Sequence, residues 1–489
     1  MNRDTFVERY GALYEHSPWV AERAWDGGVS PGAPLAPVLR RVVERAGEGA
    51  QLALLRAHPD LAGRIALTDA STEEQKGAGL DQCTPEEFEE FSRLNTDYTA
   101  RFGFPFIVAV KGLDRAGILK RFRARVENAP ATEFRTALDE VHKIAGFRLA
   151  ALTAPAPVAR EHVPAAEVER LATSALARAG ADAVNAAAIA HNMALAERCG
   201  SESHGLFRLA ASCGALQDGW INGSARPRIT RQGASLVMVD GDGGAAPGAY
   251  DLALPALGEA AKAEGVAVLS LTNTVHFGAM WPEVEVLARE GLAAFAATAN
   301  VPYLAPHGGT RPFFGTNPLA FAWPTAEGPI AFDFATSAMA RGDVMLAARD
   351  GRAVAEGVGV DAEGASTTDP EAVLAGAQLP FGAHKGSLIA MMVELLAAGL
   401  LDAPFSIETP AERRTRGIVR AGVFVLALSP DAIGGPGARA RADAWVARLG
   451  AEEGVRLPGV RRRALANTPT VAVEATLLQT VRKLAGETN

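Results

Sequence analysis

The sequence is poor in cysteine and has no excess of positive charge, and each shortage excludes a class of protein. Three cysteines, Cys83, Cys199 and Cys213, lie far apart among 489 residues, so neither a disulfide framework nor a cysteine-ligated metal site is expected. The formal net charge of −8 argues against a general nucleic-acid surface. We therefore expect a cytoplasmic protein with no metal site and no nucleic-acid partner.

The sequence also lacks a long hydrophobic run. The chain opens with the charged residues Arg3, Asp4 and Glu8 and no apolar stretch behind them, so no secretory signal is expected. The most apolar helical stretch, Ser387–Leu401, is too short to cross a bilayer and contains Glu394. We expect a buried helix there, and no membrane partner.

The chain does have enough apolar material for several cores, since 48% of its residues are hydrophobic and its length suggests about two to four domains. Residues 1–152 show helical periodicity, and Pro105 weakens the one strand-like run. Residues 153–164 carry three prolines and are typical of a semi-rigid linker. Residues 165–489 mix an Ala-rich helical stretch with β-type runs. We expect an all-α domain, a linker and a mixed α/β domain. The patterns used are Leu35–Val43, Phe88–Tyr98 and Phe134–Ala145 for helices, and Ser235–Asp240, Val266–Thr272, Ile330–Phe334 and Val419–Leu428 for strands.

Three features of the first domain bear on chemistry, and each has a structural alternative. Arg148 continues an apolar helical stripe, so it either reaches solvent, pairs with an internal anion or awaits a substrate carboxylate. The Ser71-Thr-Glu-Glu74 segment fits a helix capping box. His58 precedes a proline in an extended or turn segment and titrates near neutral pH. Taken singly, these spacings favour structural roles.

Five motifs follow one another in the first domain with matching gaps. They are His-Pro-Asp-Leu-Ala-Gly at 58–63, Ser-x-x-Glu-Gln at 71–75, Asn-x-x-Tyr at 95–98, Arg-Phe-Gly-Phe-Pro-Phe at 101–106 and Ile-Ala-x-x-Arg at 144–148. Together they resemble OHCU decarboxylase over about residues 5–152. That family removes CO2 from 2-oxo-4-hydroxy-4-carboxy-5-ureidoimidazoline to give (S)-allantoin in urate catabolism. The resemblance implies an all-α fold, no cofactor and a homodimer.

The resemblance also assigns roles. It implies that His58 is the acid or base, that Glu74 is its partner at the reacting centre, and that Arg148 clamps the carboxylate. It implies that Ser71 and Gln75 bind the polar groups of the ring or the ureido arm. These residue types suit a decarboxylation, which needs a held carboxylate and a delivered proton. The competing hypothesis is a helical binding module that has lost activity.

The second domain lacks the usual nucleotide-binding loops. The nearest approach to a dinucleotide fingerprint is Gly-Asp-Gly-Gly-Ala-Ala at 241–246. We expect Pro247 and Gly248 to interrupt the helix that should open after it, so we interpret the segment as a tight turn. No Walker A loop is present.

Polar clusters stand instead at several points of this domain. If helical, the spacing of His204 and Arg208 puts a proton donor beside a carboxylate-binding cation. His276 follows a strand, and Lys385 opens the apolar helix, where backbone amides favour an anion. Singly, each is more readily structural. The motifs are Ser-His-Gly-x-x-Arg at 203–208, His-Phe-Gly at 276–278, Gly-Thr-Asn-Pro at 315–318, Asp-x-Ala-Thr-Ser at 333–337 and Lys-Gly at 385–386.

In this order the motifs resemble the malate/L-lactate dehydrogenase-like family of non-Rossmann NAD(P)-dependent oxidoreductases, over about residues 165–465. Segments 276–285, 340–343 and 381–386 are most similar to its piperideine-2-carboxylate and pyrroline-2-carboxylate reductases. The resemblance implies a dimer and hydride transfer to or from a small cyclic imine or a 2-oxo/2-hydroxy acid. It implies these roles: His204 as proton donor, Ser203 and Asp343 as its relay, Arg208 and Thr316 as carboxylate ligands, and His276, Asp333, His384 and Lys385 as lining of the cofactor pocket.

One departure and two alternatives remain open. The family's Pro-Gly-acidic motif reads Pro458-Gly-Val460 here, which puts that cofactor contact in doubt, and Arg461–Arg463 after it either favour NADP over NAD or form a solvated face. Fusion to a urate-pathway domain suggests that this half is instead a ureidoglycolate dehydrogenase. The alternative from another class is a non-catalytic oligomerisation module.

Overall fold

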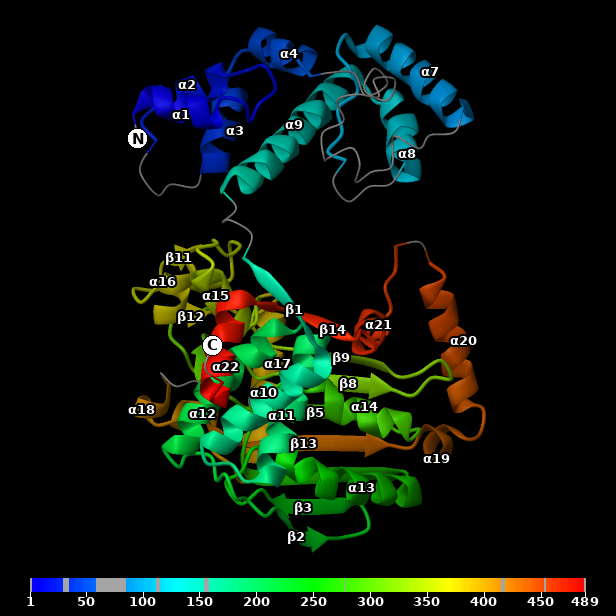
Figure 1. Cartoon of the computed structure of the whole chain (residues 1–489). Coiled ribbons are helices and arrows are strands. Elements are labelled where there is room, and N and C mark those ends of the chain that lie inside the picture. The colour runs from blue at the N-terminus through cyan, green and yellow to red at the C-terminus, as the bar shows by residue number, and fades with distance from the viewer. Residues whose placement is uncertain are drawn as a thin grey trace. The chain divides into compact units, whose positions relative to one another are not determined.

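A computed structural model describes residues 2–29, 35–58, 85–110, 115–153, 158–276, 278–414, 418–452 and 454–487. The chain divides into two compact units, Met1–Ala154 and Pro155–Asn489 (Figure 1). Within the described residues, no helix combines the length and the apolar character needed to cross a bilayer.

The N-terminal unit is helical throughout its described part. Its helices are α1 (Arg3–Tyr10), α2 (Trp19–Asp26), α3 (Leu35–Arg45), α4 (Glu48–Arg56), α7 (Pro85–Phe102), α8 (Arg115–Val126) and α9 (Pro130–Thr153). Helix α9 packs against α3, α4 and α7. The run from Phe104 to Val110 is irregular rather than a strand, and its buried phenylalanines pack around Tyr98.

The predicted helical faces of this unit form its core. Leu39 and Val43 of α3, Leu94 of α7, and Leu138 and Val141 of α9 are all buried. One polar group lies among them: the fully buried Glu133 carboxylate accepts hydrogen bonds from Arg125, Asn128 and the Tyr98 hydroxyl. Because a buried charge is costly unless paired, this network satisfies the carboxylate.

The C-terminal unit is built on a seven-stranded mixed sheet of order β2-β3-β4-β13-β5-β8-β9. Its strands are β2 (Arg228–Gln232), β3 (Leu236–Asp240), β4 (Val266–Val275), β5 (Ala293–Thr298), β8 (Leu319–Trp323), β9 (Ile330–Phe334) and β13 (Arg420–Leu428). Only the β3–β4 pair is parallel; the other neighbours in the sheet pair antiparallel. The four strand-like runs of the sequence correspond to β3, β4, β9 and β13.

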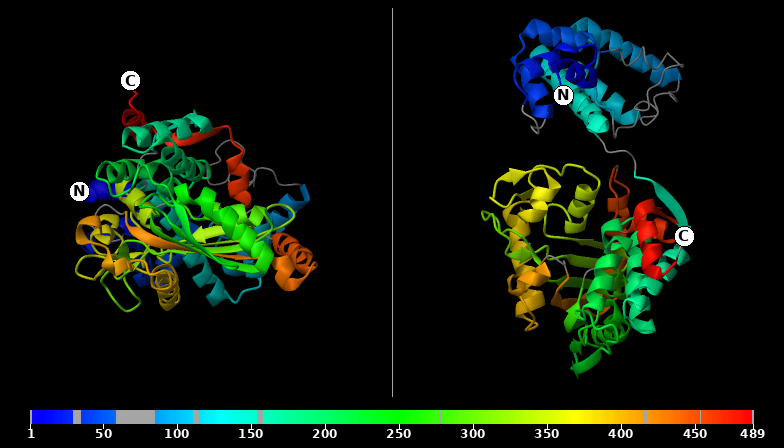
Figure 2. Two further views of the ribbon diagram at one scale, coloured as in Figure 1. Left: turned by 90° about the horizontal axis from the view of Figure 1, so that it is seen from below. Right: turned by 60° about the vertical axis from the view of Figure 1, so that its left-hand side comes forward.

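Helices cover both faces of this sheet, as the right-hand view of Figure 2 shows. Helices α13 (Pro247–Glu264) and α14 (Trp281–Arg289) pack on one face, and α17 (His384–Glu394), with the turn that continues it to Gly399, packs on the other. Pro247 therefore begins α13, and the expectation that it interrupts a helix was wrong. Proline suits a first helical position because its missing N–H has no partner there anyway.

Helix α17 also differs from the expected buried helix. One side of it, with Ala390 and Val393, lies against the sheet. The other side is exposed: Leu388 retains 56% of its accessible surface, and Met391 and Leu395 are exposed as well. Apolar composition alone did not reveal that, within the described part of the chain, one side of the helix is buried and the other exposed.

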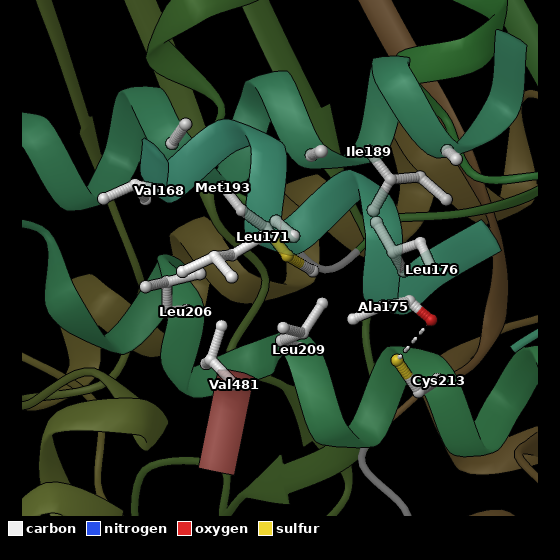
Figure 3. Close-up of a cluster of buried hydrophobic side chains, with 14 of the residues drawn as sticks. Val168, Leu171, Ala175, Leu176, Ile189, Met193, Leu206, Leu209, Cys213 and Val481 are labelled. Atoms are coloured by element: carbon white, nitrogen blue, oxygen red, sulfur yellow. Dashed lines mark hydrogen bonds between the residues drawn. The ribbon is translucent and has the colours of Figure 1, made fainter. Parts of the chain in front are cut away.

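A helical layer packs beside the sheet. The Ala-rich stretch forms two helices, α10 (Ala165–Arg178) and α11 (Ala183–Arg198), which pack with α12 (Leu209–Gln217) and α22 (Ala475–Ala485) around a shared core (Figure 3). Cys213 is buried there, with its thiol near the carbonyl of Ala175. This layer carries the loop at 199–208.

Two smaller sheets complete the unit. Strand β1 (Arg160–Pro164) pairs with β14 (Thr470–Glu474), more than three hundred residues away in the sequence. The expected linker is therefore in part a β-strand. The second sheet has the order β11-β10-β12-β6-β7. Its strands and the remaining helices are β6 (Pro302–Leu304), β7 (Phe314–Gly315), β10 (Gly359–Val360), β11 (Ser366–Thr367), β12 (Ala377–Gln378), α15 (Arg341–Arg349), α16 (Pro370–Ala375), α18 (Ala411–Arg414), α19 (Pro430–Gly434), α20 (Ala438–Gly450) and α21 (Val460–Ala466).

Candidate active sites

In the N-terminal unit, His58 lies just beyond the C-terminus of α4. Its side chain is buried, and its Nδ1 atom is 3.3 Å from the carbonyl oxygen of Leu54, one turn back. A histidine with one ring nitrogen fixed this way has a defined orientation for the other. The partners that the sequence suggests, Ser71, Glu74 and Gln75, lie outside the described residues.

Arg148 lies on α9 and already has an anionic neighbour. Its guanidinium forms an ion pair with Glu15, in the segment between α1 and α2, and approaches the carbonyl oxygens of Ala12 and Leu13. The side chains of Arg148 and Glu15 are 24% and 20% exposed. The internal pairing foreseen as one alternative is thus present, and a substrate carboxylate would compete with Glu15 for Arg148.

The C-terminal unit contains a pocket of about 840 Å³, within the range of small-molecule sites. It lies where the turn after α11 meets the ends of β4 and β9 and the first turns of α15. Of the nine residues predicted for this unit, seven line it: Ser203, His204, Arg208, His276, Thr316, Asp333 and Asp343. Segments separated by more than a hundred residues therefore meet at one site.

The segment with His204 is not the single α-helix considered from the spacing. It consists of two short 3-10 turns, Glu202–His204 and Leu206–Arg208, separated at Gly205. The Ser203 hydroxyl is 3.2 Å from His204 Nδ1, and Arg208 Nε donates to the carbonyl oxygen of Ser203 at 2.9 Å. The side chains of His204 and Arg208 nevertheless both line the pocket.

The electrostatics of His204 favour a neutral imidazole in the free protein. Burial, and then the positive charge of Arg208, lower the pKa of His204 to about 4, and Asp343 opposes this lowering. Burial likewise lowers the pKa of the Arg208 guanidinium. In the described part of the chain no carboxylate forms an ion pair with Arg208. A bound carboxylate would therefore stabilise the charged forms of Arg208 and His204 and raise both pKa values.

Two close contacts fix the other walls. A Cβ atom at Gly342 would lie 2.6 Å from that of Ser203, so only glycine lets α15 approach the 203–208 turn. The Thr316 carbonyl accepts hydrogen bonds from both the backbone N–H and the hydroxyl of Thr336, at 2.7 and 2.9 Å. This contact joins the segments of the two motifs at 315–318 and 333–337.

His276 and Asp333 line another side of the pocket. His276 Nε2 is 2.9 Å from the buried carboxylate of Glu283 in α14, which orients the ring. Asp333 accepts a hydrogen bond from the Met280 amide at 2.9 Å and lies 3.6 Å from Arg462 of α21. Arg462 in turn stacks over Trp281. Arg462 is thereby engaged within the protein, as is Arg463, which donates to the Pro329 carbonyl.

His384 and Lys385 are not among the pocket-lining residues. Both are exposed at the start of α17. Gly386 is buried, and a Cβ there would meet the Phe381 carbonyl at 2.3 Å. Gly386 thus lets the start of α17 pack closely against the backbone at Phe381.

The glycine turn at 241–246 does connect β3 to α13 and the parallel strand β4, as in a dinucleotide-binding unit. Its concave side is filled, however: a Cβ at Gly244 would lie 2.5 Å from Ala225, and one at Gly243 would lie 3.2 Å from Arg420. None of its residues lines the pocket. The interpretation as a tight turn agrees with this packing.

The sequence did not single out Tyr303 and Arg341. The Arg341 guanidinium lies 3.9 Å from the centre of the Tyr303 ring and donates to the Leu374 carbonyl at 3.1 Å, and both residues line the pocket. Burial raises the pKa of Tyr303 and lowers that of Arg341. Arg341 stands in the Ala-Arg-Gly-Asp segment already noted, which was the available signal; Tyr303 follows no motif.

Comparison with known proteins agrees with this architecture. A model of the malate/L-lactate dehydrogenase family matches residues 163–479, about two thirds of the chain. The chain belongs to this family. A model of the OHCU decarboxylase family matches residues 1–150, so a decarboxylase is fused to a malate/L-lactate dehydrogenase-family oxidoreductase, and both resemblances drawn from motifs are confirmed. Membership implies a nicotinamide cofactor.

Among relatives of the dehydrogenase-family unit, the Δ1-pyrroline-2-carboxylate/Δ1-piperideine-2-carboxylate reductase of Pseudomonas putida is 42% identical over 341 residues, 68% of this chain and 100% of the relative. A solved Δ1-piperideine-2-carboxylate reductase from Pseudomonas syringae pathovar tomato has 38% identity and a TM-score of 0.63, covering 66% of this chain and 99% of that one. A dehydrogenase structure from Sinorhizobium meliloti has 29% identity and a TM-score of 0.63, covering 67% and 99%.

Proposed function

We propose that the C-terminal unit reduces a small cyclic imine carboxylate of the Δ1-pyrroline-2-carboxylate or Δ1-piperideine-2-carboxylate type with NAD(P)H. The main support for this proposal is that one pocket is lined by His204, Ser203, Arg208 and Asp343. The 42% identity to a reductase of these imines over that relative's full length supports the substrate class.

The pocket residues suit each requirement of this reaction. Arg208 and Thr316 hold the carboxylate of the imine, and among the described residues no carboxylate forms an ion pair with Arg208 that would have to be displaced. Once the carboxylate is bound, the charge of Arg208 no longer lowers the pKa of His204 so strongly, and His204 takes up a proton more easily. His204 then delivers that proton to the imine nitrogen, with Ser203 and Asp343 orienting the ring.

A nicotinamide cofactor fits the remaining side of the pocket. When bound, it supplies the hydride that reduces the C=N carbon. His276, held by Glu283, and Asp333, held by the Met280 amide, would line its site. Arg461 is exposed at Gly200 on the pocket rim, where it suits the 2′-phosphate of NADP, since Arg462 and Arg463 are engaged elsewhere.

For the N-terminal unit we propose decarboxylation of 2-oxo-4-hydroxy-4-carboxy-5-ureidoimidazoline to (S)-allantoin, with His58 as the acid or base and Arg148 as the carboxylate clamp. The family match over residues 1–150 supports this assignment. The two proposed reactions do not share a compound, because decarboxylation removes the carboxylate that Arg208 would bind. A hydrolytic step would have to restore an acid before the second site could act on the same carbon skeleton.

Nicotinamide absorbance of the full-length protein tests the reductase assignment against its alternatives. One reaction contains NADPH and Δ1-piperideine-2-carboxylate, and the other contains NAD⁺ and ureidoglycolate. Oxidation of NADPH in the first alone supports imine reduction. Reduction of NAD⁺ in the second alone would replace it with a ureidoglycolate dehydrogenase, which the fusion itself favours. Absence of both reactions and of cofactor binding would leave an oligomerisation module.

A further inference from the structure

Glu197, near the C-terminus of α11, is a buried acid beside the catalytic turn that none of the motifs includes. Its side chain is 4% exposed, and its Oε2 atom accepts a hydrogen bond from the backbone N–H of Leu206 at 2.8 Å. A Cβ atom at Gly205 would lie only 2.0 Å from the same oxygen. The turn therefore rests directly on the carboxylate, and glycine at 205 is what allows it.

Leu206 lies midway between His204 and Arg208. Its side chain is fully buried in the helical core (Figure 3), and its N–H points to Glu197. The other side of the turn is tied by the bond from Arg208 Nε to the Ser203 carbonyl. The backbone between the proton donor and the carboxylate-binding cation is thus fixed on one side by α11 and on the other by Arg208 itself.

We propose that Glu197 is a positioning residue of the reductase site: its carboxylate fixes the 203–208 turn and thereby the placement of His204 and Arg208 against the substrate. This inference rests on the proposed imine reduction. Such placement matters because a displacement of about 1 Å in a reacting group lowers rates by about a hundredfold.

The electrostatics of Glu197 distinguish this role from that of an ordinary helix cap. Burial raises its pKa to about 7, the nearby Glu202 adds to the shift, and the Leu206 amide and Arg160 oppose it. Glu202 of the first 3-10 turn and Arg160 of β1 are themselves paired at 2.8 Å. Because an ionised carboxylate accepts a stronger hydrogen bond, the turn is held most firmly above pH 7.

The same shift acts against stability. The folded-state pKa of Glu197 lies above its unfolded value, so its contribution to stability is full below about pH 4.3 and is lost as the pH rises through 7. The ionised form that holds the turn best is thus the form that burial disfavours. Selection for stability alone would favour an uncharged residue at this position. An ionisable residue that is kept at a cost in stability is the pattern expected at functional sites.

The test compares full-length wild type with Glu197→Gln, Glu197→Ala and a matched control, Glu474→Gln. Glu474 also accepts backbone amides, those of Thr476 and Leu477 at the start of α22, and does not line the pocket. Two quantities are measured: kcat and KM for NADPH-dependent reduction of Δ1-piperideine-2-carboxylate between pH 5.5 and 9, and hydrogen–deuterium exchange of the peptide that contains Leu206.

We expect Glu197→Ala to lower kcat/KM by about tenfold to a hundredfold and to accelerate exchange at Leu206, because a buried donor loses its acceptor. Glu197→Gln keeps an acceptor oxygen, so it should retain most activity at pH 6 while the ionisation near pH 7 disappears from its kcat profile. Glu474→Gln should match wild type in exchange at Leu206 and in the shape of the profile.

Activity of Glu197→Ala within about twofold of wild type at every pH, or unchanged exchange at Leu206, would overturn the proposal. A kcat profile of Glu197→Gln that coincides with that of wild type at every pH would overturn it as well. Wild-type protein inactive on the imine would contradict the proposed function instead. The exchange measurement would then decide alone, with faster exchange in Glu197→Ala supporting the positioning role and unchanged exchange rejecting it.

Discussion

In each unit an arginine is proposed to bind a substrate carboxylate, and the surroundings of the two arginines differ. Arg148 in the N-terminal unit is partly exposed and is paired with Glu15. Arg208 in the C-terminal unit lines a pocket, donates to a backbone carbonyl, and has no carboxylate partner among the described residues. On the proposed roles, a substrate of the first site would displace Glu15 from Arg148, whereas a substrate of the second would meet an arginine without such an ion pair.

This difference shows how a site can be prepared for an anion in two ways. A pocket-lining cation without an ion pair costs stability in the free protein, which agrees with the lowered pKa of Arg208, but it would lose no partner on binding an anion. A cation that already has an ion pair is stable in the free protein and would have to give up that partner. The following predictions, from the largest effect to the smallest, test whether the two arginines and their sites behave differently.

The largest effects should come from the two histidines, and each should stay within its own unit. His204→Asn should lower imine reduction by about a hundredfold to ten-thousandfold, because a general acid contributes on that scale, and should leave decarboxylation unchanged. His58→Asn should do the reverse. Both activities are measured on each full-length variant, with circular dichroism as the folding control. Loss of both activities in one variant would contradict independent sites.

Arg208→Lys should raise KM for the imine about tenfold, with a smaller change in kcat. Lysine keeps the charge but loses the planar fork that binds a carboxylate at two points and the bond to the Ser203 carbonyl. Steady-state kinetics at pH 7.5 measure the change. A KM equal to that of wild type would remove Arg208 from substrate binding.

Glu15→Gln should lower KM for decarboxylation by up to about fivefold, because a partly exposed ion pair contributes at most about 1 kcal/mol and the substrate would no longer compete with it. Arg148→Ala is the companion variant and should raise KM. If neither variant changes KM, Arg148 is a structural partner of Glu15 and the clamp lies elsewhere.

The smallest effect concerns acid stability. Burial lowers the pKa of His142 to about 4, and its Nδ1 lies 2.8 Å from the Tyr14 hydroxyl. Since the folded pKa is below the unfolded one, near 6.5, its contribution to stability is present above pH 6.5 and is lost as the pH falls toward 4. His142→Gln should therefore lower Tm by about 2–4 °C at pH 7.5 and by less at pH 5. A deficit that is equal at both pH values, in calorimetry of the full chain, would contradict the buried neutral histidine.

The sequence predicted local structure well where a single periodicity decides it. The helical faces of α3, α7 and α9 and the strands β3, β4, β9 and β13 follow from their apolar spacing. The prediction at Pro247 was wrong because a proline can stand at the start of a helix as well as end one. The prediction at α17 was wrong because composition does not say which side of a helix is buried. The sequence also missed β1, which exists only through pairing with β14.

By itself the sequence determined the two-part organisation, the helical and mixed classes, and the residue types that meet in the reductase pocket, because motif order and hydrophobic period are properties of the chain. Only the tertiary structure decided what these residues contact. It paired Arg148 with Glu15, left His384 and Lys385 exposed, packed the glycine turn at 241–246 against Ala225 and Arg420, and placed Glu197 against the 203–208 turn. Those contacts depend on which distant segments meet and on how burial changes the pKa of a charged group. Neither can be predicted from the spacing of residues along the sequence.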